Sequence, residues 1–147
     1  MSIEIPEFSI EEWIAELKPY QKNSIVQFLQ NNEPNDVAKI WLTSHGTVNT
    51  IPFGGIRDTK PFWDNFVNEF NRFICDDHAY QNEKKDFKKD VPLSKMLLIS
   101  VISAALGAKL GFSATFVAPA VALLLFTVGK MTKNAYCATY YKDKTAI

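Results

Sequence analysis

The chain has 147 residues, of which 47% are hydrophobic and 22% are charged, and its formal net charge at pH 7 is zero. This composition is typical of a folded chain and excludes one that is disordered throughout. The charges are unevenly distributed along the chain. Residues 1–90 carry 10 basic and 15 acidic side chains, whereas residues 91–147 carry 6 basic side chains and 1 acidic one. The basic residues are dispersed and no recognisable motif accompanies them, so we expect no nucleic-acid partner.

The N-terminal segment carries the signals of a helix start. Ser9 and Glu12 have the spacing of a capping box, and Phe8 and Trp13 occupy the positions of a hydrophobic staple. Apolar residues then recur at helical spacing. This pattern predicts a helix from about residue 10 to residue 18.

Two prolines predict the starts of the next two helices. Pro19 disfavours helical geometry at the residue before it and suits the first turn of a new helix. We expect that helix to end at Asn31 and Asn32. Pro34 or Asn35 then begins a short third helix.

The segment 44–60 is rich in turn-forming residues and holds three of the chain's six glycines. Gly54 and Gly55 indicate a tight turn, because the segment lacks the pattern of glycines, lysine and hydroxyl residue found in phosphate loops. We expect a connector or a contact surface here. Four of its side chains could supply polar or stacking contacts to a ligand: His45, Asn49, Phe53 and Arg57.

An aromatic stripe marks the helix expected after Pro61. Its apolar residues lie along one helical face: Phe62, Trp63, Phe66, Val67, Phe70, Phe73 and Ile74. Such a face must be buried, which predicts the core helix of an N-terminal domain, with a partner groove as the alternative. Residues 76–90 are polar nearly all round and predict an exposed helix or a linker, so we expect a boundary at 88–93.

The stretch 96–129 contains 34 residues and a single charged side chain, Lys109. Two glycines and Ser113 within 107–113 predict a turn between helices over 94–108 and 113–132. A helix of about 20 residues is roughly 30 Å long, so only the second helix could span a bilayer alone. Pro119 predicts a kink in that helix or a later start.

Small residues recur every fourth position on both predicted helices, a spacing that lets two helix backbones approach closely. This hairpin could insert in a membrane, or it could form the buried core or an oligomer interface of a soluble protein. For the membrane case, flanking lysines predict that both ends stay cytoplasmic. The residues expected on its contact face are Ser100, Ser103, Ala104, Gly107, Ala108, Gly111, Ala114, Ala118 and Ala122.

The sequence offers little chemistry for catalysis. Neither His45 nor His78 has an obvious partner for a catalytic triad. Cys75 and His78 have a spacing seen at zinc sites, but a second pair of ligands is missing, so we expect no metal and no cofactor. Cys75 and Cys137 stand 62 positions apart without a pairing pattern. We therefore expect no disulfide, and a reducing cytoplasm is the default compartment.

The sequence thus predicts an all-α protein of five or six helices, with a cytosolic helical domain over 1–90 and a hydrophobic hairpin with a lysine and tyrosine tail over 91–147. We expect it to act by association and not by catalysis. One interpretation is a membrane anchor subunit or a small membrane-perturbing effector of the toxin or microbial defence type, at the cytoplasmic face of a membrane. A second is a cytoplasmic accessory subunit of a larger assembly, and a third is a small enzyme that uses the loop over 44–58. The expected partner is a second copy of the chain or a larger protein complex, with a membrane as a further partner in the first case.

Overall fold

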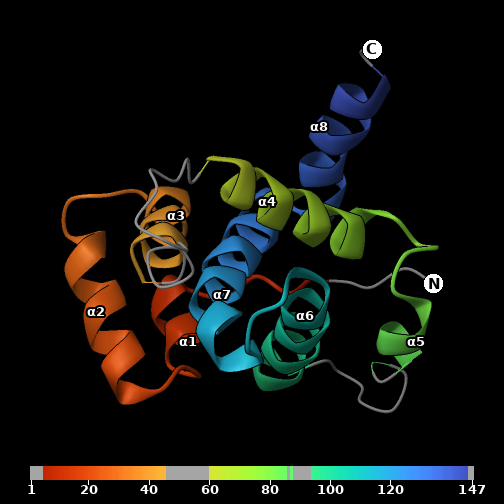
Figure 1. Cartoon of the computed structure of the whole chain (residues 1–147). Coiled ribbons are helices and arrows are strands. Elements are labelled where there is room, and N and C mark those ends of the chain that lie inside the picture. The colour runs from red at the N-terminus through yellow and green to blue at the C-terminus, as the bar shows by residue number, and fades with distance from the viewer. Residues whose placement is uncertain (1–4, 46–59, 86, 88–93, 146–147) are drawn as a thin grey trace.

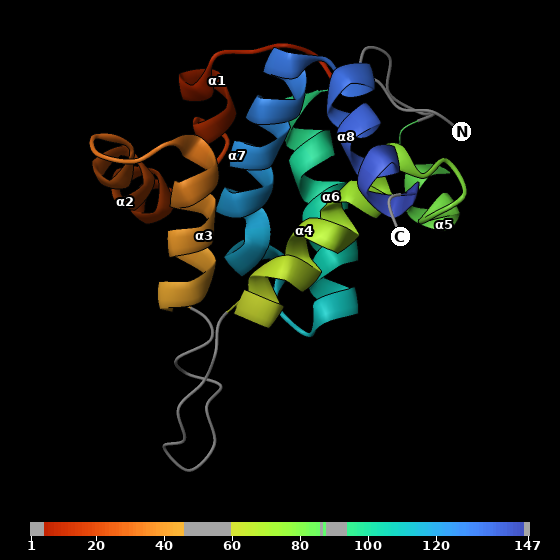
Figure 2. The same ribbon diagram turned by 90° about the horizontal axis from the view of Figure 1, so that it is seen from above.

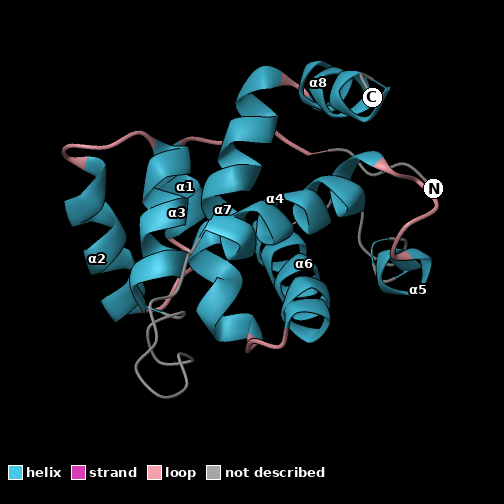
Figure 3. Cartoon of the chain, turned by 45° about the horizontal axis from the view of Figure 1, so that its top comes forward, coloured by secondary structure: helices cyan, strands magenta, loops and turns pink. Residues whose placement is uncertain are grey.

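The computed structural model describes residues 5–45, 60–85, 87 and 94–145, and its regular elements in these ranges are all helices (Figures 1 and 3). The all-α prediction is confirmed, but the predicted number of helices is wrong, because the described residues already form eight. The two additional helices are one turn in the polar segment 76–90 and a helix in the C-terminal tail. The bounds are α1 (Ile10–Ile14), α2 (Pro19–Leu29), α3 (Pro34–His45), α4 (Lys60–Cys75), α5 (Gln81–Lys84), α6 (Lys95–Leu110), α7 (Ala114–Met131) and α8 (Lys133–Thr145).

Both hydrogen bonds of the predicted N-terminal capping box are present. The Ser9 hydroxyl accepts from the Glu12 backbone N–H at 3.2 Å, and the Glu12 carboxylate accepts from the Ser9 N–H at 3.1 Å. The rings of Phe8 and Trp13 pack edge to face at 5.6 Å, which confirms the staple. The α-helix ends at Ile14 and not near residue 18, because the N–H groups of Glu16 and Leu17 bond carbonyl oxygens three residues back, in tighter turns, before the chain becomes extended at Lys18 ahead of the proline.

Helix α7 lies at the centre of the molecule, between α3 and α6, and α1 also packs on it (Figures 1 and 2). Every residue from 117 to 129 is buried or half-buried. Helix α4 packs on α6 and α3, and α8 packs on α4 and α7. A single apolar cluster contains residues from both sides of position 90, for example Trp13, Phe70 and Leu123. The division at 90 therefore stays a prediction, and the described helices share one core.

Helices α6 and α7 form the predicted hairpin. Ser94 and Ser113 cap their N-termini, accepting from the N–H groups three residues on at 3.0 and 3.1 Å. Gly111 ends α6 with φ of 86°, a left-handed conformation that suits glycine. Gly107 lies inside α6 and not in the turn, and a Cβ there would come within 2.5 Å of the Phe112 carbonyl oxygen. Glycine at 107 therefore lets the chain fold back tightly.

Candidate functional site

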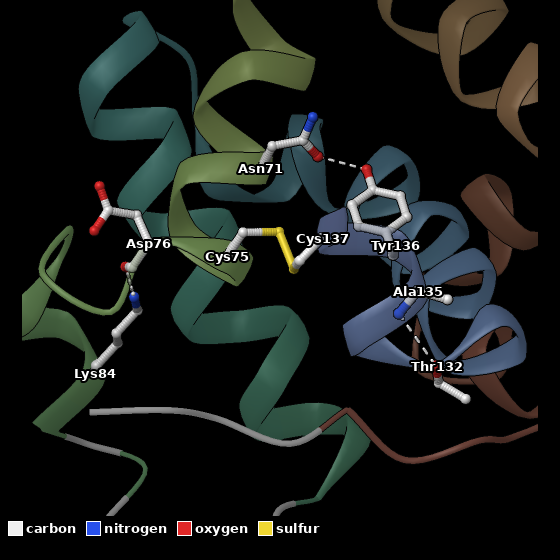
Figure 4. Close-up of a disulfide and its surroundings, with 8 residues drawn as sticks. All are labelled: Asn71, Cys75, Asp76, Lys84, Thr132, Ala135, Tyr136 and Cys137. Carbon is white, nitrogen blue, oxygen red and sulfur yellow. Dashed lines mark hydrogen bonds between the residues drawn. A yellow bond between two sulfur atoms is a disulfide. The ribbon is translucent and has the colours of Figure 1, made fainter. Parts of the chain in front are cut away.

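The two cysteines form a disulfide between the last residue of α4 and α8, so the prediction of unpaired cysteines is wrong (Figure 4). Cys75 and Cys137 have a Cα–Cα distance of 5.5 Å and are both buried. The pairing cannot be predicted from the sequence, because the two cysteines are 62 residues apart and nothing in the tail indicates a helix that packs on α4. The Cys75 sulfur is bonded and so is not a thiolate ligand for the zinc site considered with His78.

A buried lysine lies beside the disulfide. The ammonium of Lys84 donates to the carbonyl oxygen of Asp76 at 2.7 Å (Figure 4). It also lies 5.2 Å from the centre of the Phe73 ring. Burial lowers the pKa of Lys84, while the nearby Asp77 and Asp76 act in the opposite direction. A cation at the C-terminal end of α4 complements the helix dipole. We therefore assign Lys84 a structural role at this helix end.

A second link between α4 and α8 lies one turn from the disulfide. The Tyr136 hydroxyl donates to the side-chain oxygen of Asn71 (Figure 4). The Tyr136 ring packs edge to face against Phe70. Burial raises the pKa of Tyr136 from the ordinary 10.0 to about 12. The disulfide and this hydrogen bond together fix the first turns of α8 against α4.

Beside these links, α3, α4, α7 and α8 enclose a cleft of about 710 Å³, a size that fits small ligands or peptide segments. Its polar groups are mostly uncharged amides and hydroxyls. Two of its described lining residues are charged. Arg72 forms an ion pair with Glu69 at 3.0 Å, and Asp64 is exposed to solvent. The lining residues are Asn35, Trp63, Asp64, Val67, Asn68, Asn71, Arg72, Thr127, Met131, Tyr136 and Thr139.

Only Trp63 and Val67 of these cleft residues belong to a predicted contact surface, the aromatic stripe for which a partner groove was the alternative. Four helices that are distant in sequence contribute to the cleft, so no local motif reveals it. The one available signal was the polar face of the aromatic helix, where Asp64, Asn68 and Asn71 lie opposite the apolar stripe.

The predicted hairpin residues divide between the interior and the surface. Ser103, Gly107 and Ala122 are buried, and Ala118 is half-buried. The others are exposed, so the hairpin contact does not use the whole predicted face: Ser100, Ala104, Ala108, Gly111 and Ala114. A shallow groove of about 600 Å³ follows the exposed side of α6, between Ala104 and the residues Tyr80 and Glu83.

The predicted loop contacts are not among the described side chains. Asn49, Phe53 and Arg57 lie outside the described residues, and the same holds for the side chain of His45, the last residue of α3. The other histidine, His78, is exposed, and its backbone N–H donates to the Asp76 carboxylate at 3.0 Å.

Comparisons of the chain with protein-family models, curated proteins and solved structures found no match. The function must therefore be argued from the geometry of the described helices.

Proposed function

We propose that the protein acts by association, as an accessory subunit whose hydrophobic hairpin is the core of its own domain. The observation that carries this proposal is the burial of α7, whose residues 117–129 are covered by neighbouring helices. A helix that is apolar on all sides needs either lipid or protein around it, and here protein supplies that cover. The hairpin thus needs no membrane to shield the apolar surface of α7 from water.

The start of α6 supports this proposal. Lys95, which could have been an interfacial lysine of a membrane hairpin, lies 4.3 Å from the centre of the Phe8 ring and 3.8 Å from the Glu12 carboxylate. These contacts join the hairpin to the N-terminal segment.

The chemistry of the cleft supports binding over catalysis. Its described polar side chains are amides, hydroxyls, one phenol, one ion-paired guanidinium and the single exposed carboxylate of Asp64, groups that hold and orient a ligand. The partner is a protein complex or a second copy of the chain.

The disulfide also bears on location. The predicted cytoplasmic location assumed unpaired cysteines, whereas disulfides persist mainly in oxidising compartments. We therefore propose that the protein works in an oxidising compartment.

The test of the association role is the behaviour of the full chain without detergent. We expect a folded monomer or a defined oligomer by light scattering, and no flotation with liposomes of mixed neutral and anionic lipids. A protein that stays in solution only with detergent would overturn the proposal.

A membrane-perturbing effector is the second candidate, and one observation favours it. Among the described helices, α7 alone is long and apolar enough to cross a bilayer, although 56% of it is buried. For insertion, α6 and α7 would have to leave the other helices. The disulfide opposes that release, because it ties α8, which directly follows α7, to α4.

Flotation with and without a reductant distinguishes the two candidates. Ala104 is exposed, so Ala104→Glu should leave the folded domain intact, but a carboxylate at a bilayer centre costs about 2.5–3.5 kcal/mol. Ala138→Glu, at an exposed position of α8, is the matched control. The effector role requires that the reduced wild type and Ala138→Glu float and that Ala104→Glu does not. If no form floats, the effector role is excluded.

A further inference from the structure

We propose that the cleft between α4 and α8 binds an extended segment of a partner polypeptide through its main chain. This inference rests on the proposed association role and names the chemistry of the partner. It is carried by a row of polar side chains on α4 and by the groups that orient them.

Asp64, Asn68 and Asn71 stand four and three positions apart on α4, and all three line the cleft. Side chains at this spacing lie about 5–6 Å apart along one helical face. Alternate residues of an extended chain repeat every ~6.6 Å. The row therefore matches alternate peptide groups of a segment that runs along α4.

A carboxamide complements a peptide group, because it offers both an acceptor oxygen and N–H donors. The Asn71 oxygen already accepts from Tyr136, which leaves its amide nitrogen as the donor (Figure 4). On the opposite wall, the Asn35 oxygen accepts from the Thr127 hydroxyl at 3.0 Å. These bonds orient the amides before a ligand arrives, which reduces the entropic cost of binding.

The other linings of the cleft also suit a peptide. Val67 is half-buried and Met131 is 45% exposed, so both offer apolar contacts to ligand side chains. A nucleic acid would need unpaired cations for its phosphates, but the one cation among the described lining residues, Arg72, is paired with Glu69.

A saccharide is the closest competing ligand, because the same amides and hydroxyls could bind sugar hydroxyls. The one indole available for stacking belongs to Trp63, and Phe66 stacks on it at 6.0 Å with an interplanar angle of 18°. One face of the indole is therefore already covered. The length of the polar row along α4 favours an elongated peptide.

The experiment selects ligands from a displayed library of random twelve-residue peptides, using the full-length oxidised protein. Binding of the enriched peptides is followed by tryptophan fluorescence, since Trp63 lines the cleft while Trp13 and Trp41 are buried. We expect Asn68→Ala and Asn71→Ala each to weaken binding by about three- to tenfold. Asn65→Ala, on the exposed surface of the same helix and outside the cleft, should leave binding unchanged.

Peptides N-methylated at alternate residues test recognition of the main chain, and they should bind at least about tenfold more weakly. Equal binding of methylated and unmethylated peptides would overturn the proposal, as would full binding by the Asn68→Ala protein or failure to enrich any peptide. Binding of arrayed glycans that is lost in Asn68→Ala would assign the cleft to saccharides instead. If the protein is a detergent-free folded species and still binds no peptide, this inference fails while the association role stands.

Discussion

The side-chain amide of Gln21 donates to the carbonyl oxygen of Thr115 at 2.7 Å and so joins α2 to α7. In an α-helix that oxygen would accept from the N–H of residue 119, but residue 119 is proline and has no N–H. Gln21 is only 1% exposed, so its amide needs a partner as much as the carbonyl does. A side chain 94 positions away thus supplies the hydrogen bond that Pro119 removes.

We expect Gln21→Leu to lower the free energy of unfolding by about 0.5–1.5 kcal/mol, because it removes the hydrogen bond to the Thr115 carbonyl, which no N–H of α7 replaces. In a Pro119→Ala background the restored N–H can bond Thr115, so the same substitution should cost less. Gln21 also accepts from the Lys18 N–H at 3.2 Å, and that loss is common to both backgrounds. Urea unfolding of the four proteins gives the coupling energy, and Gln27→Leu on the exposed face is the control. Equal costs in both backgrounds would refute this role for Gln21.

The disulfide should contribute strongly to stability. By loop-closure entropy, a link across 62 residues stabilises the fold by about 4 kcal/mol. We expect the Cys75→Ala, Cys137→Ala double variant to lose most of this in urea unfolding and to behave like the reduced wild type. Mass spectrometry after alkylation of the unfolded, unreduced protein checks the pairing. Two alkylated cysteines would contradict the bond.

Stability should fall at alkaline pH. The raised pKa of Tyr136, about 12, means that the fold favours the protonated phenol, so this contribution is complete below pH 10 and is lost between pH 10 and about 12. Tyr80, whose pKa is raised by burial and by Glu69, acts in the same direction, and Lys84 acts in the opposite one. Tyr136→Phe should make unfolding less dependent on pH in this window, whereas Tyr20→Phe, at a 59% exposed position, should not. Parallel pH profiles for Tyr136→Phe and the wild type would count against the assignment.

Thr132, between α7 and α8, has φ of 76° and ψ of 146°, a conformation that is essentially restricted to glycine. Its hydroxyl also caps α8, accepting from the Ala135 N–H at 3.3 Å. Thr132→Gly should raise stability by about 1 kcal/mol, because relief of about 1–3 kcal/mol of strain exceeds the small cost of losing the cap. Thr132→Ala keeps the strain and loses the cap, so it should be less stable than the wild type. A lower melting temperature for both variants would contradict this account.

Elements with local signals were predictable, and long-range relationships were not. The capping box at Ser9, the prolines that begin α2 and α3, and the serines that cap α6 and α7 all act within one helical turn, so the sequence contains them in full. Helix α8 carries no apolar stripe in the sequence, and its position depends on contacts with α4.

The errors that matter for function follow from α8. Without it, Cys137 had no reason to meet Cys75, and the cleft lacked the wall that carries Tyr136 and Thr139. The hydrogen bond from Gln21 to the Thr115 carbonyl could not be predicted either, because it depends on how α2 lies against α7.

The bond between Cys75 and Cys137 closes residues 75–137 into a covalent ring that contains all of α5, α6 and α7. A protease that cuts once inside this ring produces two pieces that stay joined by the sulfur bridge, and the hairpin stays attached to α4. A single cut between α3 and α4 falls outside the ring, so only non-covalent contacts, chiefly the packing of α1, α2 and α3 on α7 and of α3 on α4, would hold those two pieces together. Cleavage therefore has different consequences on the two sides of Cys75. Fragments from a cut between residues 75 and 137 stay covalently joined, whereas fragments from a cut before Cys75 can dissociate.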